Sequence, residues 1–273
     1  FFSYTRKRST SFSWLACKIS KQQYTMRLIK IWVLIGFVLT GLFSCGDEPI
    51  EQTNTNTNTT INKIMALGAS RVEGNRPQHE SFRYETWKSL IENNWTFNFI
   101  GTQNDPGSYP VIENLNFDPD HQGRGGWTSG DILNQLENDL DQTGAPDIVL
   151  FSSPGGNDGL QNLSYDQAIS NINDIVDILQ EVNPNVTLII EQMAPGRSNI
   201  MTEELLYYFN QLQDEILIIV ENKSTATSQI IAVDMYTGFT DAMLADDVHY
   251  NTKGAMFIAQ RYYEVLTQVL EQE

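Results

Sequence analysis

The amino-acid sequence predicts an α/β fold: a three-layer α/β/α sandwich around a five-stranded parallel sheet. From about Ile61 onward, short apolar segments of strand length alternate with longer segments of helical period. The short segments are almost continuously apolar, which is typical of strands covered by helices on both faces. The region from Ile61 to the end holds roughly 210 residues, which a single domain accommodates.

The five predicted strands are short and rich in β-branched residues. They are 63–68, 96–101, 147–153, 186–192 and 229–234. In a parallel α/β sheet, functional sites form at the carboxyl ends of the strands. The loops that follow those ends are therefore the candidate functional segments: 69–78, 102–128, 153–162, 193–200 and 235–251.

Two segments between and after these strands show a clear helical period. In 164–182, apolar side chains recur on one stripe, with Ser164 as a candidate N-cap and Pro184 just beyond the end. That stripe consists of Ile172, Ile175, Val176, Leu179 and Val182, opposite Asn171, Asp174 and Asp177. The closing segment repeats the pattern with Ala255, Ile258, Ala259, Tyr262, Leu266 and Val269.

Residues 26–45 have the composition of a signal peptide. Arg27 and Lys30 precede an unbroken apolar segment, 31–43, which is too short to span a bilayer. The segment ends in the motif LFSC, whose cysteine is Cys45. This motif resembles a bacterial lipobox, and the resemblance implies that Cys45 becomes the lipidated first residue of the mature protein.

The segments around this leader complete the expected organisation. We interpret residues 1–25 as an upstream extension of the reading frame, because the chain opens on Phe1 rather than Met. A membrane-anchored helix that is never cleaved is the alternative. Residues 46–60 are a polar low-complexity run, which predicts a flexible tether to a domain at 61–273. Either interpretation places that domain outside the cytoplasm, in the periplasm or at the outer-membrane or cell surface.

Cysteine usage and charge exclude several classes of protein. The two cysteines, Cys17 and Cys45, both precede the domain, which therefore has no disulfide, zinc–cysteine cluster or thiol nucleophile. The part of the chain from Cys45 onward has 10 Lys/Arg against 34 Asp/Glu, a net charge of −24. Such a surface repels nucleic acid and anionic membranes, so we expect no nucleic-acid partner and membrane contact only through a lipid at Cys45.

Ser70 follows the first predicted strand and lies where the next helix begins. A serine hydroxyl is a poor nucleophile at neutral pH unless a base is close to it. His249, just before the last helix, can supply that base, and Asp246 lies three residues earlier. In a tight turn this spacing brings the carboxylate to one imidazole nitrogen and leaves the other nitrogen to take the serine proton.

Acyl transfer also requires hydrogen-bond donors for the developing oxyanion. Asn157 follows the third predicted strand, and its amide NH₂ can supply one donor. Gly126, in the glycine-rich motif GRGGW, can offer an unobstructed backbone N–H. Together with the N–H of Ser70, these groups make three candidate donors.

Four motifs in this order resemble the four blocks of the SGNH hydrolases, also called GDSL esterases. They are GAS with Gly74 four residues beyond the serine, the glycine of GGW, GGND after a strand, and DDVH before the last helix. The likeness covers roughly 62–270 and implies a flavodoxin-like sheet. It also implies that Ser70 is the nucleophile, Gly126 and Asn157 are oxyanion donors, His249 is the base and Asp246 its orienting partner.

The stretch from ESFRYETW to FDPDHQGRGGW is similar to carbohydrate esterase family three, the acetylxylan esterases. That family has a G-x-x-R-like helix start, an FVGS-like second strand and a DHEGHSGW-like loop. This chain departs from the pattern at three positions. Ala69 replaces the usual aspartate before the serine, which puts reaction rate and the order of the serine loop in question. Gly156 replaces a threonine, and Arg124 replaces a histidine and is expected to alter the acceptor sugar site.

Other residues carry weaker indications. His121 is expected to brace the long loop rather than to take part in chemistry. The cluster Asp118, Asp120 and His121 is weak support for a cation site. Sugar stacking by the aromatic residues is less expected than a place in the core; the candidates are Trp127, Tyr109 and Trp87.

The sequence thus predicts a serine esterase that removes acyl groups, above all O-acetyl, from a carbohydrate by a Ser-His-Asp mechanism. It needs no cofactor and no metal. Two alternatives remain open: a catalytically inactive SGNH-like protein that binds glycans at the surface, suggested by Ala69 and Gly156, and a lipase or thioesterase of the same superfamily.

Overall fold

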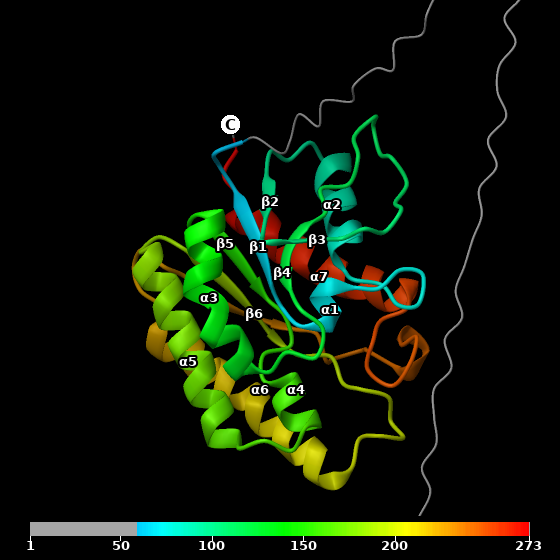
Figure 1. Ribbon diagram of the computed structural model, residues 1–273, viewed down its shortest axis with the longest axis vertical. Coiled ribbons are helices and arrows are strands. Elements are labelled where there is room, and N and C mark those ends of the chain that lie inside the picture. Colours follow the sequence, from blue (N-terminus) through cyan, green and yellow to red (C-terminus); the bar gives the residue numbers. More distant parts are fainter. Residues whose placement is uncertain (1–58, 273) are drawn as a thin grey trace, which may run out of the picture. The chain divides into compact units, whose positions relative to one another are not determined.

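The computed structural model describes residues 59–272 (Figure 1). The predicted extension (1–25), signal peptide with Cys45 (26–45) and nearly all of the tether (46–60) lie outside these residues. Within the described part of the chain, no helix combines the length and the apolar character needed to cross a bilayer.

The strands lie close to the predicted segments, with two additions. They are β1 (Lys63–Gly68), β2 (Asn98–Ile100), β3 (Gln103–Asn104), β4 (Asp120–Gly123), β5 (Ile148–Phe151), β6 (Thr187–Gln192) and β7 (Ile230–Asp234). β1 is flanked by β5 on one side and by both β2 and β4 on the other. β5, β6 and β7 follow in that order, all parallel, as in a flavodoxin-like sheet.

The helices cover both faces of the sheet, as Figure 1 shows. They are α1 (Ser70–Glu73), α2 (Arg83–Glu92), α3 (Ser129–Thr143), α4 (Gly156–Leu160), α5 (Tyr165–Val182), α6 (Glu203–Lys223), the 3₁₀ turn η1 (Asp241–Met243) and α7 (Thr252–Val269). α2 and α7 pack on one face, and α3, α5 and α6 on the other. The three-layer prediction is confirmed.

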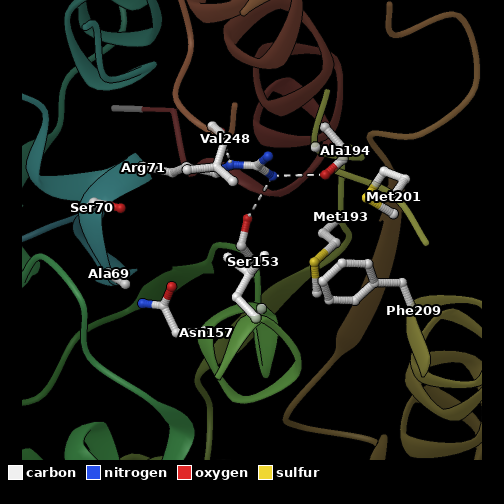
Figure 2. A pocket seen from close by; sticks show the side chains of 13 residues that line it. Ala69, Ser70, Arg71, Ser153, Asn157, Met193, Ala194, Met201, Phe209 and Val248 are labelled. Atoms are coloured by element: carbon white, nitrogen blue, oxygen red, sulfur yellow. Dashed lines mark hydrogen bonds between the residues drawn. The ribbon is translucent and has the colours of Figure 1, made fainter. Parts of the chain in front are cut away.

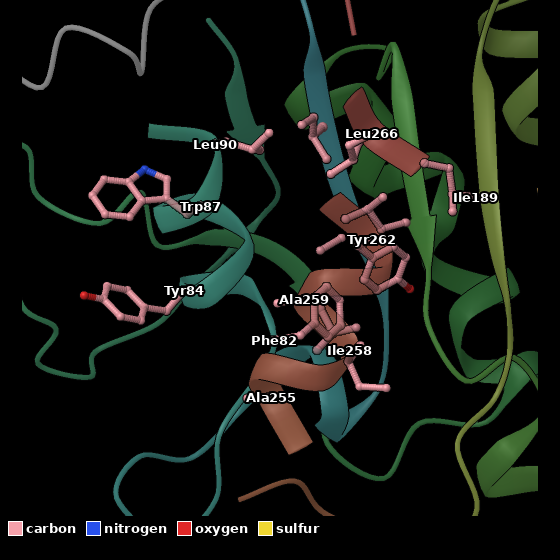
Figure 3. Packing of buried hydrophobic residues seen from close by; sticks show 14 of the residues in the cluster. Phe82, Tyr84, Trp87, Leu90, Ile189, Ala255, Ile258, Ala259, Tyr262 and Leu266 are labelled. Atoms are coloured by element: carbon pink, nitrogen blue, oxygen red, sulfur yellow. The ribbon is translucent and has the colours of Figure 1, made fainter. Parts of the chain in front are cut away.

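Alternate residues of the central strands enter two separate hydrophobic cores. Ile64 and Ala66 of β1 face α2 and α7, whereas Met65 and Leu67 face α3, α5 and α6. All four side chains are almost fully buried, since successive strand residues point to opposite faces and both faces are covered. Figure 3 shows the first core, where α7 packs against β1 and α2.

The strand count differs from the prediction because β4 has a polar sequence. Within residues 59–272 the sheet has seven strands rather than five, and both extra ones, β3 and β4, lie in the predicted loop 102–128. β2 pairs with the first half of β1. On the same side of β1, Gln122 and Gly123 of β4 pair with its last two residues. The side chain of Gln122 is buried but satisfied by Asp139. Hydrogen bonds therefore stabilise a strand that carries no apolar signal.

The helix predictions hold with two corrections. Ser164 caps α5 by accepting a hydrogen bond from the backbone N–H of Gln167. Val182, predicted on the apolar stripe, is 44% exposed because it lies in the last turn, and Asn171, predicted on the outer face, is 8% exposed. The amide of Asn171 donates to the Ser129 hydroxyl at the start of α3, and this bond satisfies it in the interior.

Candidate active site

Ser70 opens α1 directly beyond the carboxyl end of β1. The short helix forms because the N–H groups of Val72 and Glu73 donate to the carbonyl of Ala69, and the chain leaves it at Gly74. β1 is a central strand, with β4 and β5 on its two sides. The serine is therefore held at the middle of the sheet edge, where the following loops converge.

The structure brings Ser70, His249 and Asp246 into one hydrogen-bonded chain. The Oγ of Ser70 lies 2.9 Å from Nε2 of His249. Nδ1 of the same ring lies 2.7 Å from Oδ2 of Asp246. Because an ionised carboxylate can only accept, Nδ1 carries the proton and Nε2 is left to accept from the serine hydroxyl. Residues 179 positions apart thus meet with the geometry of a nucleophile, a base and an orienting acid.

A tight turn holds Asp246 in its ionised form. Its Oδ1 accepts the backbone N–H groups of Val248 and His249 at 2.9 and 2.8 Å, while Oδ2 faces the imidazole. Partial burial by itself raises the pKa of this carboxyl, but the backbone and ring donors outweigh that effect and lower the pKa to about 2. The carboxylate therefore stays charged throughout the neutral range and fixes the imidazole tautomer.

Two of the three predicted oxyanion donors, Gly126 and Asn157, belong to segments that are hydrogen-bonded to each other. Nδ2 of Asn157 donates to the carbonyl of Trp127 at 2.7 Å, which uses one of its two hydrogens and leaves the other free to donate. Nε2 of Gln161 donates to the carbonyl of Gly126 at 3.2 Å. Gly126 has φ +78°, a left-handed conformation that glycine adopts without strain, and the position where a Cβ would lie is open. Both donor positions are therefore fixed before any substrate arrives.

A buried carboxylate strengthens this connection. Asp158, next to Asn157, is 3% exposed and accepts both the N–H and the hydroxyl of Ser129, at 2.8 and 2.7 Å. Ser129 is the first residue of α3 and follows the Gly126 turn by three positions. The carboxylate thus meets the positive end of the helix and joins the two oxyanion segments.

Arg71, the residue after Ser70, connects the serine turn to the loop that carries His249. Its guanidinium donates to the carbonyls of Val248 at 2.9 Å, Ala194 at 2.7 Å and Pro195 at 3.2 Å, and lies over the ring of Tyr250 at 4.8 Å. Figure 2 shows this side chain reaching across the site. Because Val248 and Tyr250 flank His249, one side chain fixes the base loop relative to α1. The sequence reasoning did not identify this role.

Glu191 supports the same network from inside the sheet. It is the sole acid in the sequence TLIIEQ of β6 and is fully buried. Its carboxylate accepts the N–H and hydroxyl of Ser153 and the phenol of Tyr262, and Ser153 Oγ accepts from Arg71 at 3.3 Å. Burial raises the pKa of Glu191, although these donors and Arg71 act in the opposite direction. An acid within an apolar strand was a sequence signal for this network.

Two unequal cavities meet at Ser70. One is an apolar pocket of about 40 Å³ between Asn157 and Val248, floored by Met193 and Phe209 (Figure 2). The other is a polar groove of about 670 Å³. Its walls include Ser70, Gly126, Asn157 and His249, so the predicted donors, nucleophile and base face one space; further lining residues are Glu73, Asn75, Arg76, Asn104 and Asp105.

The structure also shows where Arg124, the two tryptophans and His121 lie, for which the sequence indications were weaker. Arg124 does not line the groove: it forms a two-point ion pair with Asp139 at 2.8 and 2.9 Å, and its guanidinium lies 4.4 Å from the Trp127 ring centroid. Its side chain is therefore engaged with α3 rather than with the groove. Trp127 packs on the core beside α3, and Trp87 is fully buried in the other core. Nδ1 of His121 accepts the N–H of Gly123, which braces the loop.

The suggested cation cluster does not come together. Among residues 59–272, the one group of three potential ligands that gathers is His79, Asp246 and His249, rather than Asp118, Asp120 and His121. Two members of this group are already bonded to each other in the chain to Ser70. The two imidazole rings are stacked, so their in-plane lone pairs lie side by side and do not converge on one ion.

Several solved structures of esterases have the same fold as this chain. The sequence matches no protein-family model and no curated protein. A serine-to-alanine mutant of an acetyl esterase, solved with an acetate ion, is 28% identical with a TM-score of 0.66, over 77% of this chain and 98% of that one. A carbohydrate esterase family 3 protein from Talaromyces cellulolyticus is 27% identical with a TM-score of 0.66, over 77% and 98%. The family 3 carbohydrate esterase of Clostridium thermocellum is 28% identical with a TM-score of 0.61, over 76% and 96%.

The chain is an SGNH hydrolase. It is an ester hydrolase and is similar to carbohydrate esterase family 3, as the motifs around Ser70, Gly126, Asn157 and His249 indicated. In this SGNH hydrolase the usual aspartate before the serine is absent, and Arg71 bridges the serine turn and the histidine loop with side-chain hydrogen bonds. These bonds connect the serine turn to the rest of the site, although Ala69 has no side-chain group that could do so.

Proposed function

We propose that this SGNH hydrolase removes short acyl groups, above all acetyl, from a carbohydrate. Ser70 acts as the nucleophile, His249 as the general base and acid, and Asp246 as the orienting carboxylate. The observation that carries the proposal is the unbroken chain of contacts from Ser70 Oγ to His249 at 2.9 Å and on to Asp246 at 2.7 Å, at the junction of two cavities.

In the first half-reaction, Ser70 Oγ attacks the ester carbonyl carbon while its proton passes to Nε2 of His249. Negative charge develops on the carbonyl oxygen, and three groups can donate to it: the N–H of Ser70, the N–H of Gly126 and the free hydrogen of the Asn157 amide. Asp246 stabilises the imidazolium that forms. The intermediate collapses as Nε2 returns the proton to the leaving alcohol, which gives an acyl-serine.

In the second half-reaction, water takes the place of the alcohol. Nε2 of His249 removes a proton from the water as its oxygen attacks the acyl carbon, and the same proton then returns to Ser70 Oγ. The carboxylic acid leaves and the free enzyme is restored. The chain thus supplies every proton transfer from its own residues.

The apolar pocket favours a short acyl chain. Its volume is small, about 40 Å³, and Met193 and Phe209 are among the apolar side chains that line it. Gly156 lines this pocket, where a Cβ would lie 3.5 Å from the sulfur of Met193. These dimensions favour acetyl over the long chains that a lipase or thioesterase accepts.

The groove favours an alcohol with many hydroxyl groups. Its side chains offer carboxylates, amides and a guanidinium within one space of about 670 Å³. Such groups recognise sugar hydroxyls by paired donation and acceptance. The acetyl esterase and carbohydrate esterases described above support the same substrate class.

The test is hydrolysis of p-nitrophenyl acetate and acetylated xylan by the wild-type protein, Ser70→Ala, and the control Ser89→Ala on α2. Loss of the nucleophile is expected to lower kcat by about 10⁴-fold or more, whereas the control stays near wild type. A fluorophosphonate probe should label the wild type and the control but not Ser70→Ala. Wild-type turnover by Ser70→Ala would show that the assignment is wrong. A rate maximum with esters longer than butyrate would favour the lipase alternative.

We further propose that the protein acts outside the cytoplasm, anchored by a lipid at Cys45. The supporting feature is the sequence of residues 26–45, which begins with basic residues, continues with an apolar segment and ends in LFSC. Metabolic labelling with a radioactive fatty acid in a bacterial host tests this. Label is expected on the wild type and not on Cys45→Ala, and equal labelling of both would contradict the anchor.

A further inference from the structure

A second histidine stacks directly on the ring of His249. The ring centroids of His79 and His249 lie 4.0 Å apart, and the ring planes are inclined by only 17°. Nε2 of His79 is buried and has no hydrogen-bond partner, so this ring is not held there by a polar contact of that nitrogen. The contact between the two rings is therefore one of faces.

The backbone explains why the rings meet. The N–H of Glu80 donates to the carbonyl of Tyr250 at 2.8 Å, so the residues next to the two histidines are paired. On its other side, the segment carrying His79 closes a turn through paired hydrogen bonds between Asn75 and His79. The His79 ring thus stands on a backbone that is bonded to the base loop itself.

Further contacts hold this turn rigidly. Arg76 forms an ion pair with Glu80 at 3.2 Å and lies over the ring of Tyr109 at 4.6 Å. It also donates to the carbonyl of Ser108 at 3.3 Å. The turn is therefore fixed to the loop that follows β3, and His79 presents an ordered flat surface.

We propose that His79 is a positioning residue that keeps the imidazole of His249 in the plane shared by Ser70 and Asp246. This inference rests on the proposed function. The contacts of His249 to Ser70 and Asp246 are both made by its ring nitrogens, so neither resists a tilt of the ring about the line that joins them. A flat ring packed on one face blocks that tilt. The restraint matters most after attack, when the Ser70 hydroxyl no longer donates to Nε2.

The charge of His79 suits this role. Burial lowers its pKa, and the nearby His249 lowers it further, against the opposite effect of Asp246. His79 is therefore neutral at neutral pH. A neutral aromatic face adds no repulsion when His249 becomes an imidazolium, and it can interact favourably with that cation.

The test compares His79→Phe, which keeps a flat ring, with His79→Ala, which removes it, on p-nitrophenyl acetate and acetylated xylan. We expect His79→Ala to lower kcat by about 10-fold or more on both substrates with little change in KM, since small misplacements of a catalytic group are costly. His79→Phe should stay within about 3-fold of wild type. Because acetyl is common to both substrates, an equal loss indicates an effect on the base rather than on sugar binding.

Three results would overturn the inference. The first is a wild-type kcat in His79→Ala. The second is an effect of His79→Ala that is confined to a higher KM for acetylated xylan. The third is a loss of kcat in His79→Phe equal to that in His79→Ala, which would mean that a ring nitrogen, and not the flat ring, is required. If His79→Ala does not fold, as judged by its thermal transition, His79→Leu fills the same space without a flat ring and carries the same expectation. Retained activity in Ser70→Ala would instead contradict the proposed function, so the two failures are distinct.

Discussion

Replacing Asn157 with alanine isolates the contribution of one oxyanion donor. The Asn157 amide makes one contact in the resting protein, to the Trp127 carbonyl at 2.7 Å, and its second hydrogen is free to meet the developing charge. Removing a single preorganised donor of this kind costs about 2.7–4 kcal/mol in the transition state, or about 10²–10³-fold in kcat. Because the ground-state carbonyl is weakly bound, KM should change little.

The same substitution has a smaller effect on folding, and this separates catalysis from stability. Loss of the bond to Trp127 costs about 1 kcal/mol. For a domain of this size, that lowers the thermal midpoint by about 2–4 °C. Asn173→Ala is the matched control, because its amide also donates to a backbone carbonyl, that of Ile169 at 2.9 Å, but lies on α5 away from either cavity.

The assay is steady-state hydrolysis of p-nitrophenyl acetate, with thermal unfolding followed in parallel. Asn157→Ala should lose kcat by at least about 10²-fold, whereas Asn173→Ala should lose stability alone. Residual activity is expected, because the N–H groups of Ser70 and Gly126 remain. A kcat for Asn157→Ala within 3-fold of wild type, or an equal loss in the control, would refute the reasoning.

Two further predictions concern the residues around the site. Arg71→Lys keeps the positive charge but loses the forked guanidinium that reaches Val248 and Ala194, so kcat should fall about 10-fold or more. The control is Arg197→Lys, because the Arg197 guanidinium also donates to this loop but from the solvent side, and its loss of kcat should be smaller. Equal losses in the two variants would contradict the role of Arg71 in holding the loop. Burial, and then the charge of Asp120, raises the pKa of Asp118 to about 7, so the folded state retains a proton that the unfolded chain releases near pH 4. The contribution of Asp118 to the free energy of unfolding therefore falls as pH rises from about 4 to about 7. In urea unfolding, the stability of Asp118→Asn relative to wild type should rise by at least about 1 kcal/mol between pH 5 and pH 8. A difference in stability that stays constant over this range would contradict the raised pKa.

Much of the fold followed from local patterns in the sequence. β-branched apolar segments identified β1, β2, β5, β6 and β7, because a strand buried on both faces must be apolar along its whole length. The same logic failed at β4, whose sequence DHQG is buried through hydrogen bonds rather than through apolar contact. A pattern of apolar residues has no information on where a distant partner will satisfy a buried amide.

For the site, the sequence by itself determined which residues lie in the loops that follow the strands and in which order: Ser70, Gly126, Asn157, Asp246 and His249. Only the tertiary structure decided that Ser70 and His249 lie 2.9 Å apart, that Arg71 reaches the loop that carries His249, and that His79 stacks on the ring of His249. The reason is physical. The chain's local preferences extend over a few residues, whereas a hydrogen bond or a ring contact depends on tenths of an ångström between loops far apart in sequence, which the packing of the whole sheet and its helices fixes.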